Sequence, residues 1–185
     1  MNTTFTSPRL SHRLALLMAA ATLGAGLQMP AQAAQATATA TGTVVTPIAI
    51  SAATSLVFGS FSAGPGGSVT VSTSGVRAAS GPVLMAAATP SAARFNITGS
   101  PASTYSITHS GTTVLTNTTG TGGETMALSK CSDLTAANTT SGNVSTGTLD
   151  GSGAQSLYVG GTLSVAAAQV PGVYTGTVIA TVEYN

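Results

Sequence analysis

The sequence predicts an all-β protein, an antiparallel Ig-like β-sandwich built from about ten short strands. Three observations predict this fold class. Short segments alternate apolar with hydroxylated residues, so that one face of each extended segment is apolar. Glycine- and proline-containing turns separate these segments at intervals of about 8–12 residues. Beyond the N-terminal region, no segment sustains helical periodicity over about 12 residues.

The N-terminal region has the pattern of a secretory signal peptide. Arg9, His12 and Arg13 precede an apolar run over residues 14–27, and the small-residue sequence Ala31-Gln32-Ala33 follows. We expect cleavage after residue 33 and a secreted protein in the periplasm, on the cell surface or outside the cell. A membrane anchor is the alternative, but the run is shorter than the roughly 20 apolar residues of a membrane span. We therefore expect no membrane insertion after cleavage.

A flexible N-terminal arm, residues 34–46, is expected between the signal peptide (residues 1–33) and the sandwich domain (residues 47–185). Residues 34–43 are mostly alternating Ala and Thr. Such small side chains bury little area, which is compatible with a disordered leader. The alternative is a donor strand that forms when the arm meets an acceptor edge of another chain. The larger apolar residues available to such a donor are Val44, Val45, Ile48 and Ile50.

Within the domain, strand patterns recur in order along the chain. Pro47 places the first segment at an edge or a bulge, because proline cannot donate to a strand ladder. Gly160 and Gly161 predict a bulge or bend in a late strand, and residues 133–137 could form one helical turn. The expected strands cover residues 44–50, 56–61, 68–72, 83–85, 93–97, 104–108, 114–115, 125–129, 144–149, 157–165 and 173–185.

The last of these segments has the clearest strand pattern. Its hydroxyl-rich face is expected to contact solvent, so the strand is half-buried. A strand at this position either closes the sheet or leaves its edge for another chain. The residues predicted to form this assembly strand are the apolar-face residues and the glycine before them: Gly172, Tyr174, Val178, Ala180, Val182 and Tyr184.

Charge and cysteine content exclude several classes of function. Charged residues make up 5% of the chain, and after residue 33 three basic side chains oppose four acidic ones, a net charge of −1. Nucleic acid is therefore not an expected partner, because there is no basic stripe to hold its phosphates. Cys131 is the only cysteine, so an internal disulfide cannot form. An inert thiol is the favoured interpretation, and an intermolecular disulfide is the alternative.

No motif indicates catalysis, a metal site or a cofactor. His109 is the only histidine after the signal peptide and has no histidine, cysteine or carboxylate at metal-ligand spacing. A Ser-His-Asp set could be assembled only from distant residues, and with so many serines and threonines such a set carries no information. We expect a protein without enzymatic activity and without a cofactor.

Several ordered motifs resemble the bacterial secreted family called domain of unknown function 4402. The resemblance covers about residues 47–185. It rests on Leu56-x-Phe58-Gly59 and on segments 66–71, 93–99, 160–165 and 172–178.

A more distant resemblance is to spore coat protein U-type subunits of chaperone–usher pili. It rests on Phe58-Gly59, on the penultimate Tyr184, and on Gly172, which is fourteenth from the C-terminus. The resemblance implies an incomplete Ig-like fold in which the N-terminal arm of a neighbour supplies a strand. It also implies self-association or related subunits as partners, with a periplasmic chaperone and usher.

Two functional hypotheses follow. The first is a secreted structural subunit of a bacterial surface fibre or coat that assembles by β-strand addition. The alternative is a monomeric secreted β-sandwich that binds a surface glycan or an envelope protein. A secreted hydrolase is disfavoured, because the catalytic constellation is missing.

Overall fold

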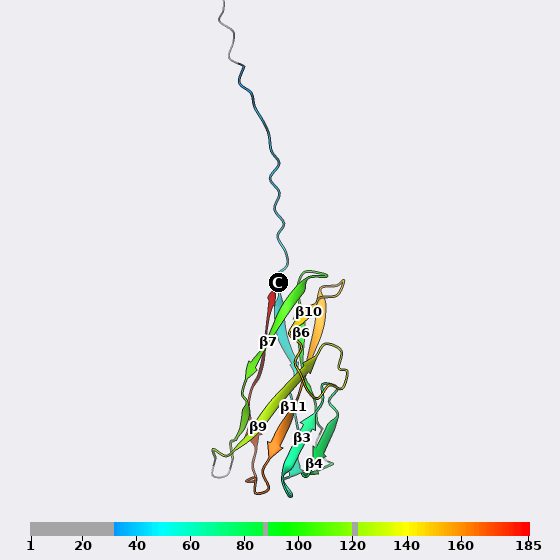
Figure 1. Cartoon of the computed structure of the whole chain (residues 1–185), viewed down its shortest axis with the longest axis vertical. Helices are drawn as coiled ribbons and strands as arrows, with labels where there is room; N and C mark the ends of the chain where they lie inside the picture. The colour runs from blue at the N-terminus through cyan, green and yellow to red at the C-terminus, as the bar shows by residue number, and fades with distance from the viewer. Residues whose placement is uncertain (1–31, 87–88, 120–121) are drawn as a thin grey trace, which may run out of the picture. The chain divides into compact units, whose positions relative to one another are not determined.

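The computed structural model describes residues 32–86, 89–119 and 122–185. The basic and apolar parts of the expected signal peptide therefore lie outside the described residues. The chain divides into two units, residues 1–43 and residues 44–185. In the first unit, the described residues 32–43 are exposed and contain no helix or strand. The second unit holds all the strands (Figure 1).

The described residues form thirteen strands and no helix, which confirms the all-β prediction. The strands are β1 (Ala49–Thr54), β2 (Phe61–Ser62), β3 (Gly67–Val71), β4 (Arg77–Ser80), β5 (Val83–Leu84), β6 (Ala93–Thr98), β7 (Thr104–Gly111), β8 (Val114–Asn117), β9 (Thr125–Asp133), β10 (Thr146–Thr148), β11 (Ala154–Val165), β12 (Tyr174–Thr175) and β13 (Val178–Tyr184).

Two antiparallel sheets form the expected sandwich. The larger has the strand order β1-β6-β11-β9-β8-β12, with β3 and β4 attached through β11, and the smaller has the order β10-β7-β13. A two-stranded pair, β2 with β5, is separate from both. Every strand pair among the described residues is antiparallel.

The main core lies between the two sheets. Ile97 and Leu157 of the larger sheet and Tyr105 of the smaller one are completely buried. A second apolar cluster lies on β3, β9 and the end of β11, with Val69 and Leu163 at its centre. In β3 and β6, buried residues alternate with intermediate or exposed ones, as the period-two pattern predicts. The second cluster borders the groove described below.

The long strand β11 changes its neighbour at Gly160. On one edge, Ala154 to Val159 pair with β6, and Gly161 to Val165 pair with β3. Of the expected bulge or bend, the bulge does not form, because the opposite edge pairs with β9 in unbroken register through both glycines. Glycine is needed for a different reason: a Cβ at Gly160 would lie less than 3 Å from the Val71 carbonyl oxygen.

Cys131 lies opposite Gly160 on β9 and fits into the space that the glycine leaves. Its side chain is 1% exposed, and its thiol donates to the Thr139 carbonyl at 3.4 Å. Burial raises the pKa of the Cys131 thiol, which disfavours the reactive thiolate. This environment agrees with the inert thiol that the sequence favours.

Three local expectations differ from the structure. The first strand begins at Ala49, after Pro47 and not before it, because proline lacks the N–H that a ladder requires. The expected strand of residues 56–61 is irregular up to Ser60, with a single bridge at Val57 and a positive φ of 73° at Gly59, and only Phe61 lies in a strand, β2. No helical turn forms over residues 133–137, where Ala136 has a φ of 53°.

Candidate functional site

An apolar groove of about 920 Å³ lies beside the second core cluster. Its floor comes from the larger sheet, where Met126, Leu128 and Leu163 present their side chains. One wall is the segment of residues 56–64, which is irregular up to Ser60 and contains the short strand β2. The other wall is the segment of residues 169–176 together with Val178. Of the lining residues, only Val178 belongs to the smaller sheet.

The first wall is fixed by Arg77, which sequence analysis did not identify. Its guanidinium donates to the carbonyls of Phe58 at 2.8 Å, Ser60 at 3.2 Å and Met85 at 2.9 Å. The planar guanidinium can hold several carbonyls at once. These bonds satisfy backbone acceptors that a regular strand would pair with a neighbouring strand, so the wall stays irregular.

The second wall is closed at one end by the loop before β12. The Tyr174 hydroxyl donates to the Val170 carbonyl at 2.7 Å and accepts from the Gln169 amide at 2.7 Å. Gly172 lies against the side chain of Asn117, where a Cβ would clash with the amide group. Gly172 is therefore required for close packing of this wall.

One edge of the C-terminal strand segment is unpaired. β12 pairs with β8 and β13 pairs with β7, and no described strand pairs with the opposite edge of either. Backbone bonds from Thr112 to Thr177, from Thr118 to Val173 and from Asn185 to Thr104 show which residues bond the partner strands. In each bond the residue of the C-terminal segment, Thr177, Val173 or Asn185, is odd-numbered. In an antiparallel ladder the alternate, even-numbered residues direct their N–H and C=O groups to the free edge.

The structure divides the predicted assembly-strand residues into two groups. Gly172, Tyr174 and Val178 line the groove. The other three contact the main core, where Val182 is buried and Ala180 and Tyr184 are partly buried. The predicted faces agree with the observed exposure, because the odd-numbered residues 173–183 are exposed.

The predicted donor residues also divide into two groups. Ile48 and Ile50 are partly buried against the main core of their own chain, and Ile50 belongs to β1. Val44 and Val45 are exposed, at 100% and 55%. Only these two bulky side chains of the set are therefore free to contact another molecule.

Ser132 and His109 form a pair that resembles part of a hydrolase site. Ser132 Oγ lies 3.0 Å from His109 Nε2, but the Val144 amide also donates to Ser132 Oγ at 3.0 Å. Ser132 is only 4% exposed, and His109 Nδ1 has no hydrogen-bond partner among the described residues. A catalytic triad requires an accessible nucleophile and a carboxylate that orients the imidazole. This pair instead connects β7, β9 and the segment around Val144.

The neighbouring Asp133 carboxylate has partners other than His109. It accepts hydrogen bonds from the Thr73 hydroxyl and from the backbone amides of Thr135 and Ala137. Partial burial opposes ionisation, but these hydrogen bonds outweigh it and lower the pKa of Asp133. Asp133 therefore anchors the loop after β9.

This lowered pKa predicts a pH-dependent contribution to stability. A carboxylate whose pKa is lower in the folded state stabilises the fold above its unfolded pKa, and the contribution is lost as the pH falls through the folded pKa. In thermal unfolding, Asp133→Asn is expected to lower Tm at pH 7 and to have little effect near pH 2. Glu183→Gln is the control, since it removes an exposed carboxylate. A Tm difference for Asp133→Asn that stays constant across this range would contradict the prediction.

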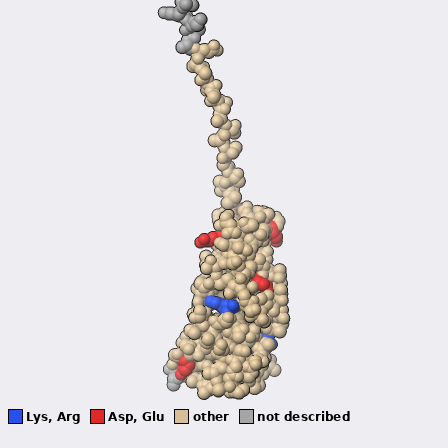
Figure 2. All heavy atoms as spheres, viewed as in Figure 1, with Lys and Arg blue, Asp and Glu red and all other residues tan. Residues whose placement is uncertain are grey.

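Charged side chains do not gather at any site on the face shown in Figure 2, where they are few and scattered. Within the part of the chain that the structure describes, no three metal-binding side chains cluster. No helix formed by those residues has the length and apolar character needed to cross a membrane. Among the described residues, the groove and the adjacent strand edge are candidate binding features.

Comparison with known proteins gives one match. A family model described as a domain of unknown function, DUF4402, matches residues 48–184. No curated protein and no solved structure matches the chain.

Proposed function

The chain belongs to the DUF4402 family, and we propose that this member is a secreted, non-enzymatic structural subunit of a bacterial surface fibre or coat that assembles by β-strand addition. The signal-peptide pattern at the N-terminus supports the location. The observation that carries the proposal is the free edge of β12 and β13 beside an apolar groove.

The free edge lacks the devices that usually prevent strand addition. Edge strands are commonly protected by charges, prolines or bulges. β13 contains a single charged residue, Glu183, has no proline, and pairs with β7 in regular register. Its free N–H and C=O groups are thus available to an incoming strand, whose backbone bonds would supply affinity.

The groove explains why an added strand would be stabilised by side chains as well. Phe61, Leu115 and Tyr174 are only partly buried although they pack against the second core cluster. An incoming strand with one apolar face would cover them and gain free energy at about 25 cal/mol per Å² of buried apolar area. In this proposal a periplasmic chaperone would cover the same edge before assembly. At an usher, the next subunit would then replace the chaperone on this edge.

An unboiled denaturing gel of surface-sheared or secreted protein tests the proposal. We expect a ladder of bands that collapses to the monomer on boiling, because strand-exchanged polymers dissociate only when the subunits unfold. A single monomer band in both lanes would contradict a strand-exchanged polymer.

The groove also favours a second candidate function, a monomeric sandwich that binds a surface glycan or an envelope protein. A volume of about 920 Å³ lies within the range of ligand sites, and the wall contains Phe61 and Tyr174, whose rings could stack on a sugar. Saturable binding to a glycan array by a protein that stays monomeric would favour this candidate over the fibre subunit.

A further inference from the structure

One basic side chain of the domain keeps nitrogen atoms for another molecule. Arg77 donates to three carbonyls, as described above, and the Lys130 ammonium donates to two more, at 2.6 and 3.2 Å. Arg94 donates only through Nε, to Asn96 Oδ1 at 3.2 Å. Its terminal nitrogens Nη1 and Nη2 have no partner among the described residues. Arg94 is exposed, so an anion from solution can reach these nitrogens.

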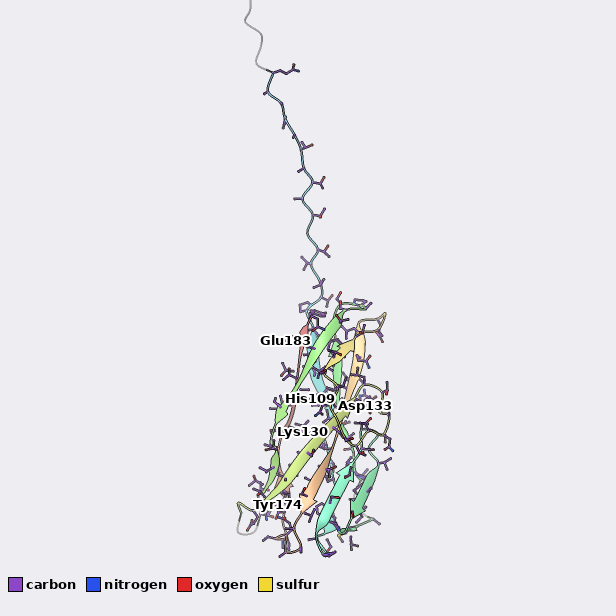
Figure 3. The ribbon with its side chains drawn as sticks, viewed as in Figure 1. His109, Lys130, Asp133, Tyr174 and Glu183 are labelled. Carbon is purple, nitrogen blue, oxygen red and sulfur yellow. The ribbon has the colours of Figure 1, made fainter. Side chains whose placement is uncertain are left out.

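The acidic side chain in the same cross-strand row, Asp133, is bonded elsewhere. In the register of the larger sheet, Tyr158 of β11 lies between Arg94 of β6 and Asp133 of β9. The Asp133 carboxylate accepts its hydrogen bonds from Thr73 and from the loop after β9. Lys130 and Asp133 both belong to β9 (Figure 3). The two ionised groups of β9 are thus bonded within the fold, and the Arg94 guanidinium stays available.

Arg94 belongs to a polar patch on the side of the larger sheet that faces away from the main core. On β6 the odd-numbered residues 93–97 are buried, which places the even-numbered ones on the outer side. Their partners in the register are on β1 and β11. The outer patch comprises Arg94, Asn96, Thr98, Ser51, Ser156 and Tyr158, all of them exposed or partly exposed.

Tyr158 adds an aromatic ring to the outer patch. It is directly opposite Arg94, so their Cβ atoms are about 4.5–5.5 Å apart. Tyr158 is partly exposed, and its hydroxyl has no hydrogen-bond partner among the described residues. The hydroxyls of Tyr174 and Tyr184, in contrast, both bond to backbone carbonyls. A ring with a polar tip can contact a ligand through its apolar face and through its hydroxyl.

From these observations we propose that the outer patch binds a saccharide that carries a carboxylate. The Arg94 guanidinium pairs with the carboxylate through two parallel N–H···O bonds. The Tyr158 ring packs against the apolar C–H face of the sugar, and the Asn96 amide and the Ser156 hydroxyl bond its hydroxyl groups. The inference goes beyond the proposed function, because no residue of the outer patch lines the groove or belongs to β12 or β13.

The position of the patch within the sheet favours a saccharide over an acidic peptide. β6 is paired on both sides, with β1 and with β11, so its backbone N–H and C=O groups are already bonded. A peptide lying on this face would find no backbone partners for its own amide groups. A sugar needs only side-chain donors and acceptors, which the patch supplies.

Binding of the folded, secreted protein to polygalacturonate tests the ligand class. Every ring of this polymer carries a carboxylate, and the fully methyl-esterified polymer is the matched control without the charge. In affinity gel electrophoresis we expect retention by polygalacturonate and at least about tenfold weaker binding to the ester. Equal binding to both polymers, or to neither, would overturn the inference. Polyglutamate bound as tightly as polygalacturonate would show that the ligand class is wrong, and so would stronger competition by inorganic phosphate than by galacturonate.

Two substitutions with the same change of net charge test the site. Arg94→Gln is expected to weaken binding to polygalacturonate at least about tenfold. Thr108→Glu also makes the net charge more negative by one, but on an exposed residue of the smaller sheet, and is expected to leave binding nearly unchanged. Tyr158→Thr, which keeps a strand-forming residue, is expected to weaken binding without loss of the folded state in thermal unfolding. Equal losses in Arg94→Gln and Thr108→Glu would show that net charge alone attracts the polymer, which would overturn the site.

Discussion

Ala180→Pro is expected to reduce assembly strongly and to leave the monomer folded. The N–H of Ala180 is directed to the free edge, because the bonds to β7 come from the odd-numbered residues. Proline at this position therefore breaks no bond to β7, and proline is tolerated on edges of this kind. Without the N–H of residue 180, one carbonyl of an incoming strand would stay unpaired, at a cost of about 1–3 kcal/mol. The proline ring would also clash with the incoming backbone.

The expected loss of polymer is about tenfold to a hundredfold, which corresponds to about 1.4–2.8 kcal/mol. It can be measured as the proportion of heat-sensitive ladder on unboiled gels, together with the Tm of the monomer. Ala180→Val is the matched control, because it adds the same number of carbon atoms and keeps the N–H. Polymer formation by Ala180→Pro at the wild-type level would show that the edge of β13 is not the acceptor.

The second large effect is expected from a single methyl group at Gly160. Gly160→Ala should destabilise the fold by about 2–3 kcal/mol, because overpacking against backbone forces it to shift. The added Cβ would contact the Val71 carbonyl, the Ser72 backbone and the Cys131 sulfur. For a domain of this size the corresponding decrease in Tm is roughly 4–12 °C.

Thermal unfolding of Gly160→Ala beside Gly151→Ala checks this prediction. Gly151 has open space where a Cβ would be added, so its substitution is expected to leave Tm nearly unchanged. Equal Tm values for the two variants would show that β11 can change partners from β6 to β3 without the close approach at Gly160.

Local alternation was sufficient to predict the strands that pack against the cores. Phe95 and Ile97 of β6, Tyr105 and Ile107 of β7, and Val69 and Val71 of β3 are buried at a spacing of two, because this spacing places side chains on one face. The same pattern predicted the inward face of β13 correctly. The fold class and most strand positions could therefore be predicted without knowledge of any contact.

Long-range pairing could not be predicted in this way. The pattern of residues 56–61 is that of a strand, but residues 56–60 are irregular, and Arg77 binds the carbonyls of Phe58 and Ser60 there. Ile48 and Ile50 have the residue types of a donor, but they pack against their own core. Tertiary contacts decide such cases, because strand propensity depends on the neighbours that a strand finds.

The sequence by itself determined the all-β class and the half-buried C-terminal strand, since each depends only on the alternation of side chains along an extended backbone. The tertiary structure decided which edge is left unpaired, that a groove lies beside it, and that the Tyr184 hydroxyl binds the Thr46 carbonyl. These features depend on contacts between residues far apart in the chain, which the order of residue types does not specify.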